Sequence, residues 1–167
     1  MAYTASAVTA PNRAGTVVRS LLLFIARLAF AAILLAHAWW RWSVAGIDAQ
    51  TAMLRDHQIP QAEVLAYATI VFEAMAGALL VLGLLTRFVS AVVVIEQALV
   101  IALIKLPSGV YLADGGFEYN AALATLGVVF LAVGAHHVGL DALFARGRRA
   151  DRDDDELYQP ALGSSQL

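Results

Sequence analysis

Four stretches of about 20 mostly apolar residues follow one another along the chain, at about 20–42, 64–85, 88–106 and 119–138. A helix of this length crosses the hydrocarbon core of a bilayer, which is about 30 Å thick. Inside that core only a helix or a closed barrel pairs all backbone hydrogen-bonding groups, and none of the stretches shows the two-residue alternation of a barrel strand. The sequence therefore predicts an all-α integral membrane protein, folded as an antiparallel bundle of four transmembrane helices.

The composition excludes an ordinary water-soluble domain. Hydrophobic residues make up 60% of the chain, charged residues make up 14%, and the mean hydropathy is +0.72, whereas about a quarter of the residues in soluble domains are charged. The chain has no cysteine, which excludes disulfides, cysteine-ligated iron–sulfur clusters and dithiol chemistry of its own. Its net charge of −2 provides no positive excess for a polyanion, so no nucleic-acid partner is expected.

The basic residues near the helix ends predict how the bundle is oriented in the membrane. Seven of them fall on one side (Arg13, Arg19, Arg87, Arg146, Arg148, Arg149 and Arg152) and three on the other (Arg41, Arg55 and Lys105). Because cytoplasmic loops are enriched in Lys and Arg, both termini are expected in the cytoplasm. The first stretch is too long for a signal peptide and ends in an aromatic cluster, Trp39-Trp40-Arg41-Trp42, which is typical of a membrane interface.

Polar segments flank the predicted membrane domain, which covers residues 19–145. Residues 1–18 are rich in Ala, Thr, Ser and Pro and are expected to be a disordered cytoplasmic segment. Residues 146–167 begin with a basic run and continue with an acidic one, a pattern typical of a solvated, disordered tail. The alternative for this tail is a docking segment for a soluble partner.

Polar side chains interrupt the apolar stretches at similar depths. Arg27 and Glu96 lie about eight residues from the predicted cytoplasmic ends of their helices and Glu73 about twelve, so at 1.5 Å per residue their depths agree within about 6 Å. Gln97 lies at the same level. A charge at the centre of a bilayer costs about 2.5–3.5 kcal/mol, so these four residues are expected to meet inside the bundle. Two carboxylates against one guanidinium predict a protonatable glutamate.

The role of this buried polar cluster stays open between two interpretations. It can be an ion pair that stabilises helix packing, since the second stretch carries small residues (Ala74, Gly77 and Ala78) that allow helices to approach closely. It can also be the polar floor of a site for a ligand or a proton. No catalytic residue is assigned.

A second polar layer is expected near the outer face, formed by His37, Arg41, Glu118, Tyr119 and Asn120. His37 and Arg41 are four residues apart and share one helix face. Glu118 is expected either to pair with Arg41 or to start the last helix together with Asn120. The other histidines lie in an outer loop or near the inner end of the last helix, too far from His37 to ligate a haem with it, and no metal site is predicted.

Three sequence segments carry a resemblance to a known family. They are Glu73-Ala-Met-Ala-Gly77-Ala-Leu-Leu-Val-Leu-Gly83-Leu-Leu-Thr-Arg87, Gly116-Phe-Glu118-Tyr-Asn120 and Gly139-Leu-Asp141. In order and spacing they resemble the DoxX family of small four-helix bacterial membrane proteins, over about residues 20–145. Arg27 lies where the family usually has an early arginine. The end of the last stretch, Gly134-Ala-His-His-Val-Gly-Leu-Asp141, departs from the family pattern Gly-Pro-Gly-Arg-Tyr-Ser-Leu-Asp, because histidines replace its arginine.

The resemblance implies a multi-pass protein of the bacterial cytoplasmic (inner) membrane and leaves its reaction unassigned. Related proteins include the membrane subunit of thiosulfate:quinone oxidoreductases, and others accompany redox complexes with soluble thiol or superoxide-detoxifying partners. One expectation is therefore a membrane subunit or scaffold of a redox complex, with a soluble or membrane redox partner. The alternative is a quinone-linked oxidoreductase subunit, in which Arg27, Glu73 and Glu96 hold the quinone head group or pass protons. A small-molecule or proton transporter is a third reading, and the oligomeric state is not predicted.

Overall fold

The computed structural model describes residues 13–134, and this part of the chain is helical, without strands. Its α-helices are α1 (Arg13–Trp39), α2 (Ile47–Asp56), α3 (Ala62–Leu82), α4 (Thr86–Val100) and α5 (Glu118–Val133). Two π-helical turns continue α1 and α4, namely η1 (Trp40–Ala45) and η2 (Ile101–Lys105), and two 3-10 helices precede α5, namely η3 (Leu106–Ser108) and η4 (Leu112–Asp114). The prediction of an all-α protein is confirmed for the described residues.

Three of the described helical segments are long and apolar enough to cross a membrane: Ala14–Ala45, Ala62–Leu82 and Thr86–Ser108. The described α5 is also apolar, but its 16 residues are fewer than the about 20 that a span needs. The fourth predicted span, 119–138, extends past the described residues. The count of four spans and the cytoplasmic position of both termini therefore stay predictions.

Two segments differ from the expectation drawn from the sequence. The prediction of disorder is wrong for residues 13–18, because α1 begins at Arg13 and includes these residues. The segment 43–63 connects the first two predicted spans and is therefore an outer loop in the predicted topology. It contains α2, whose Thr51 and Leu54 are buried and whose Ile47 packs on the same apolar cluster. This three-to-four-residue spacing is that of an amphipathic helix. The predictions made for residues 1–12 and 135–167, including the charged tail, lie outside the described residues.

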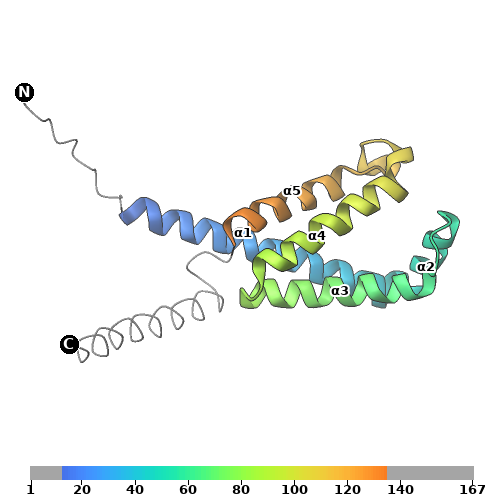
Figure 1. Cartoon of the computed structure of the whole chain (residues 1–167), viewed down its shortest axis with the longest axis horizontal. Helices are drawn as coiled ribbons and strands as arrows, with labels where there is room; N and C mark the ends of the chain where they lie inside the picture. Colours follow the sequence, from blue (N-terminus) through green and yellow to red (C-terminus); the bar gives the residue numbers. More distant parts are fainter. Residues whose placement is uncertain (1–12, 135–167) are drawn as a thin grey trace, which may run out of the picture.

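The described helices form two antiparallel hairpins (Figure 1). In the first hairpin α1 packs mainly against α3, and in the second α4 packs mainly against α5. We call one end of the bundle the tryptophan end, because it carries Trp39, Trp40 and Trp42 beside α2, and the other the turn end, because it carries the connection Gly83–Leu85. The first part of α1 extends past the turn end of the other helices (Figure 1).

Small residues set how closely the helices approach within each hairpin. A Cβ atom added to Gly77 in α3 would lie 2.6 Å from Leu35 Cγ and 3.0 Å from the carbonyl oxygen of Ala31. In the second hairpin a Cβ atom at Gly127 would lie 2.8 Å from Val94 Cγ2. Both glycines therefore allow contacts that no larger residue permits at this helix separation.

The main apolar core lies between the two hairpins. Phe30 of α1 stacks on Phe130 of α5 with a centroid distance of 6.0 Å, and both rings are fully buried. Around them lie the other buried residues of this core, Ala31, Leu34, Ala76, Leu80, Val89, Val93 and Leu123. A second, smaller apolar cluster at the tryptophan end joins α2, α3 and η2 through Leu54, Ala62, Ala66 and Ile104.

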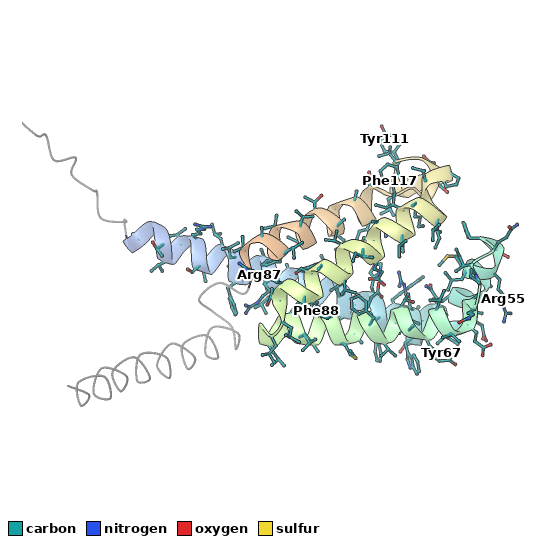
Figure 2. All side chains as sticks on the ribbon, viewed as in Figure 1. Arg55, Tyr67, Arg87, Phe88, Tyr111 and Phe117 are labelled. Carbon is teal, nitrogen blue, oxygen red and sulfur yellow. The ribbon has the colours of Figure 1, made fainter. Side chains whose placement is uncertain are left out.

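The connection between the hairpins is a tight helix-ending turn. Gly83 has φ +67°, its N–H donates to Leu80 O, and the N–H of Leu84 donates to Leu79 O at 2.9 Å, which is the Schellman pattern. Arg87, at the start of α4, donates from Nη2 to the carbonyl oxygen of Ala132 near the end of α5 at 3.2 Å. Figure 2 shows Arg87 at the turn end, opposite Arg55 and Tyr67. These contacts hold α3, α4 and α5 together at that end.

Candidate functional site

An ion pair buried between α1 and α3 is the centre of the candidate site. Arg41 Nη1 lies 3.0 Å from Glu73 Oε1, and the side chain of Glu73 is only 2% exposed. Arg41 belongs to the π-helical turn η1, in which wider winding changes the direction of the side chains relative to an α-helix. Because α1 and α3 are antiparallel and helical side chains lean toward their own N-terminus, the two side chains converge from opposite directions.

The second hairpin contributes a buried pair of amides. Asn120 Nδ2 donates to Gln97 Oε1 at 2.7 Å, and both residues are buried. Gln97 Nε2 in turn donates to Glu96 Oε2 at 3.5 Å. The amides therefore join α4 to α5 and connect the Glu96 carboxylate to this network.

The two hairpins meet electrostatically around these groups. Glu96 interacts with both Glu73 and Arg41, and Tyr119 interacts with the same two residues. His37 of α1 stacks on the Tyr119 ring with a centroid distance of 4.9 Å and an interplanar angle of 15°. We call these seven residues the polar cluster: His37, Arg41, Glu73, Glu96, Gln97, Tyr119 and Asn120.

The polar cluster is neither fully neutralised nor fully hydrogen-bonded by the described residues. It contains two carboxyl groups, one guanidinium and one imidazole, so its charge is balanced when one carboxyl or the imidazole carries an additional proton. Glu73 Oε2 and Tyr119 Oη are buried and have no hydrogen-bond partner among the described residues. A buried polar atom without a partner costs about 1–3 kcal/mol. The arrangement therefore favours protonation of one carboxyl and a bound group, such as water or a polar head group, that has both donors and acceptors.

Arg27 does not belong to this cluster, contrary to the expectation from equal depths. Gly77 of α3 lies against Ala31 and Leu35 of α1. From this contact, Arg27 is four residues before Ala31, toward the turn end. Glu73 is four residues before Gly77, but because α3 runs antiparallel to α1 it lies toward the tryptophan end. At 1.5 Å per residue, Arg27 and Glu73 are therefore about 12–15 Å apart along the bundle. Arg27 is buried nearer the turn end, where its guanidinium lies 5.4 Å from the Phe24 ring centroid.

Glu118 lies at the start of α5, which is the second of the two alternatives expected for it, and it does not pair with Arg41. Its Oε1 accepts a hydrogen bond from the backbone N–H of Leu112 at 2.8 Å, so it stabilises the loop before α5, and the carboxylate beside Arg41 is that of Glu73. The structure thus merges members of the two predicted polar layers into one cluster and leaves Arg27 and Glu118 outside it. Sequence reasoning missed the pair of Arg41 and Glu73, because it depends on the register between α1 and α3.

The described residues contain no group of three or more His, Asp or Glu side chains that could hold a metal ion. The donors and acceptors of the polar cluster are a guanidinium, a phenol, an imidazole, two amides and two carboxyls. The chemistry that this set supports is hydrogen bonding and proton transfer.

Comparison with known proteins identifies a family. The family model described as DoxX matches residues 22–106. The matched segment holds Arg41, Glu73, Glu96 and Gln97, whereas Tyr119 and Asn120 follow it. No curated protein and no solved structure shows significant similarity to the chain.

Proposed function

The chain belongs to the DoxX family of membrane proteins, and on that basis we propose that it is the membrane subunit of a redox complex in the bacterial inner membrane and that its polar cluster binds a quinone head group. One observation carries the ligand proposal: the Glu73 carboxylate is almost completely buried beside Arg41, yet its Oε2 has no hydrogen-bond partner among the described residues. The choice of a quinone as the ligand follows from its chemical structure. A quinone combines an apolar tail, which partitions into the bilayer, with a polar ring that needs a few donors.

Each residue of the polar cluster has a role that follows from its groups. The Arg41 guanidinium and the Tyr119 hydroxyl are donors for ring oxygens, and the stacked His37 can donate or accept according to its tautomer. Glu73 and Glu96 share one excess negative charge, so a proton can rest on either carboxyl. A bound quinone would supply two-electron, two-proton chemistry; the electrons would come from a redox partner in the complex, and the protons would pass through these carboxyls.

The test measures quinone bound to the purified protein. Lipid extraction and mass spectrometry of the wild-type protein in mild detergent should find more quinone than an unrelated membrane protein of similar size carries. Glu73→Gln should lower this excess about tenfold, the loss expected when about 1.4 kcal/mol of binding free energy is removed. Glu63→Gln is the matched control, because Glu63 lies on the same helix with a side chain that is 71% exposed, and it should not change the quinone content.

A second candidate function is a scaffold without a ligand, and one observation favours it. The polar cluster connects both hairpins, through the Gln97 and Asn120 hydrogen bond and the interactions of Glu96 with Glu73 and Arg41, so it also contributes to helix packing. The scaffold is the better account if the wild-type protein shows no quinone excess in several mild detergents and if quinone analogues leave its thermal stability unchanged.

A further inference from the structure

The seam between α1 and α5 is closed by two aromatic stacks at different depths. Toward the turn end, Phe30 and Phe130 are fully buried and apolar. Toward the tryptophan end, His37 and Tyr119 are only half-buried and carry polar atoms. Because Phe30 and His37 are seven residues apart, they share one face of α1. The seam is thus dry on one side of the polar cluster and polar on the other.

The other routes to the polar cluster pass through buried residues, most of them apolar, although Arg27, Thr86 and Ser90 are buried polar residues on the side of the turn end. Between the cluster and the Gly83–Leu85 turn lie Ala76 and Leu80 of α3 and Val89 and Val93 of α4, all of them buried. Toward α2 the way is filled by the second apolar cluster of Leu54, Ala62, Ala66 and Ile104. Among the described residues on these routes, the stacked His37 and Tyr119 differ from the others because they are polar and only half-buried.

The depth of the polar cluster agrees with this asymmetry. Tyr67 of α3 contacts Trp42, with ring centroids 6.4 Å apart, so it lies at the level of the interfacial tryptophans. Glu73 is six residues from Tyr67 and ten from Gly83, which corresponds to about 9 Å and about 15 Å. The carboxyl groups are therefore closer to the tryptophan end than to the turn end.

From these observations we propose that the polar cluster exchanges water and protons with the aqueous phase at the tryptophan end alone, and that the stack of His37 and Tyr119 is the gate on this route. The imidazole can accept and donate a proton, and the Tyr119 hydroxyl, which has no partner among the described residues, can relay it toward Glu73. The purpose of the route rests on the proposed function, because quinone chemistry consumes or releases protons. Water access along the route is measured without any quinone. The route can therefore be refuted while quinone binding stands, and quinone binding can be refuted while the route stands.

The absence of cysteine makes single-cysteine variants a clean test of this route. Ala38 and Ala31 are matched positions, because they are seven residues apart on α1, both buried and both inward-facing. Ala38 lies between His37 and Arg41, on the tryptophan side, whereas Ala31 lies against Gly77, beyond the polar cluster. The probe is a membrane-impermeant, cationic methanethiosulfonate, which reacts with a thiolate in contact with water.

In sealed vesicles of known orientation, Ala38→Cys should react when the reagent is added on the tryptophan side, at least about tenfold faster than Ala31→Cys. Adding His37→Ala to Ala38→Cys should open the gate and speed this reaction further, whereas Tyr119→Phe, which keeps the ring, should not. If Ala31→Cys does not fold, Ala76→Cys on α3 is the inner reference, since it is equally buried. Three results would each overturn the proposal. The first is modification of Ala38→Cys by reagent added on the turn side. The second is an equal rate of modification for Ala38→Cys and Ala31→Cys, and the third is an unchanged rate when His37→Ala is added.

Discussion

Arg41, at the end of the first transmembrane helix, contacts Glu73, in the middle of α3, with a distance of 3.0 Å between Nη1 and Oε1. The pair lies deep in the first hairpin and faces Glu96 and Tyr119 of the second. It therefore serves two purposes in the bundle, since it fixes the register of α1 against α3 and places a carboxyl where the hairpins meet.

Breaking this pair on one side should be strongly destabilising. Arg41→Leu leaves Glu73 buried without its counter-charge, which costs about 3–5 kcal/mol. The double variant Arg41→Leu with Glu73→Gln should recover part of this loss, because the carboxylate that pairs directly with Arg41 is then neutral and no longer repels Glu96. The free energy of unfolding in mixed detergent micelles measures the cycle.

The matched control for this cycle is the pair of Arg55 and Glu63. These side chains are 4.0 Å apart and 66% and 71% exposed, so Arg55→Leu should change the stability by less than about 1 kcal/mol. Two results would contradict the assignment of a buried pair. One is an equal loss of unfolding free energy for Arg41→Leu and Arg55→Leu. The other is a strictly additive effect of the Arg41 and Glu73 substitutions on that free energy.

The amide pair in the second hairpin gives a separate prediction. Asn120→Ala leaves the Gln97 amide buried without its donor, and should cost about 1–3 kcal/mol. Replacing both residues by leucine should cost less than this single change, because neither partner of the buried amide hydrogen bond is then left alone and Glu96 loses only its long 3.5 Å contact with Gln97 Nε2. Thermal unfolding compares these variants with Thr125→Ala on the exposed side of α5, whose hydroxyl bonds only within its own helix and which should be nearly neutral. A double leucine variant that is less stable than Asn120→Ala would contradict the prediction.

Position 77, where α1 and α3 are in close contact, should not tolerate any residue larger than glycine. Gly77→Ala places a Cβ atom 2.6 Å from Leu35 Cγ, and overpacking of this kind costs about 1–3 kcal/mol. Leu35→Ala in the same chain should relieve part of the strain. Gly15→Ala is the control, because no atom lies within 4 Å of its added Cβ, and it should be neutral or stabilising. An equally mild effect at Gly77 would mean that α1 and α3 pack less closely than the structure shows.

The orientation in the membrane is a prediction from the distribution of basic residues. Ser108→Cys, in η3 at the tryptophan end, should react with an impermeant maleimide added outside intact cells. A cysteine in place of Ser164, in the predicted cytoplasmic tail, should react only after the membrane is permeabilised. The reverse labelling pattern would show that the bundle is inserted the other way round.

The apolar helices and several buried polar residues could be predicted from the sequence for simple physical reasons. Apolar runs of about 20 residues indicate membrane spans. The cost of an ionisable group in lipid places Glu73 inside the bundle, and the cost of an unpaired polar group does the same for Gln97. Both are buried in the structure. The bounds of the spans were harder to predict, because apolar composition does not mark where α1 begins.

The choice of Arg41 over Arg27 as the partner of Glu73 could not be predicted from depth alone. Counting residues from a common inner surface treats all helices as if they began at the same level, whereas α1 extends past the turn end (Figure 1). The true register depends on how Gly77 fits against Ala31 and Leu35, which is a packing detail between helices far apart in the sequence. The same limit applies to α2, whose helix depends on the apolar cluster beneath it.

The division of the described bundle into two hairpins has a consequence for how the protein assembles. Most contacts of each hairpin are made between helices that are close in the sequence, so each can form soon after it enters the bilayer, as locally connected structures do. The stacks of Phe30 on Phe130 and of His37 on Tyr119 form only when the hairpins dock. Until then Glu96 of the second hairpin is separated from Arg41, which already pairs with Glu73 inside the first hairpin. The penalty for a carboxyl exposed to lipid therefore favours docking in the register that brings Glu96 to this pair. The residues of the polar cluster thus also favour the correct pairing of the two hairpins while the protein assembles in the membrane.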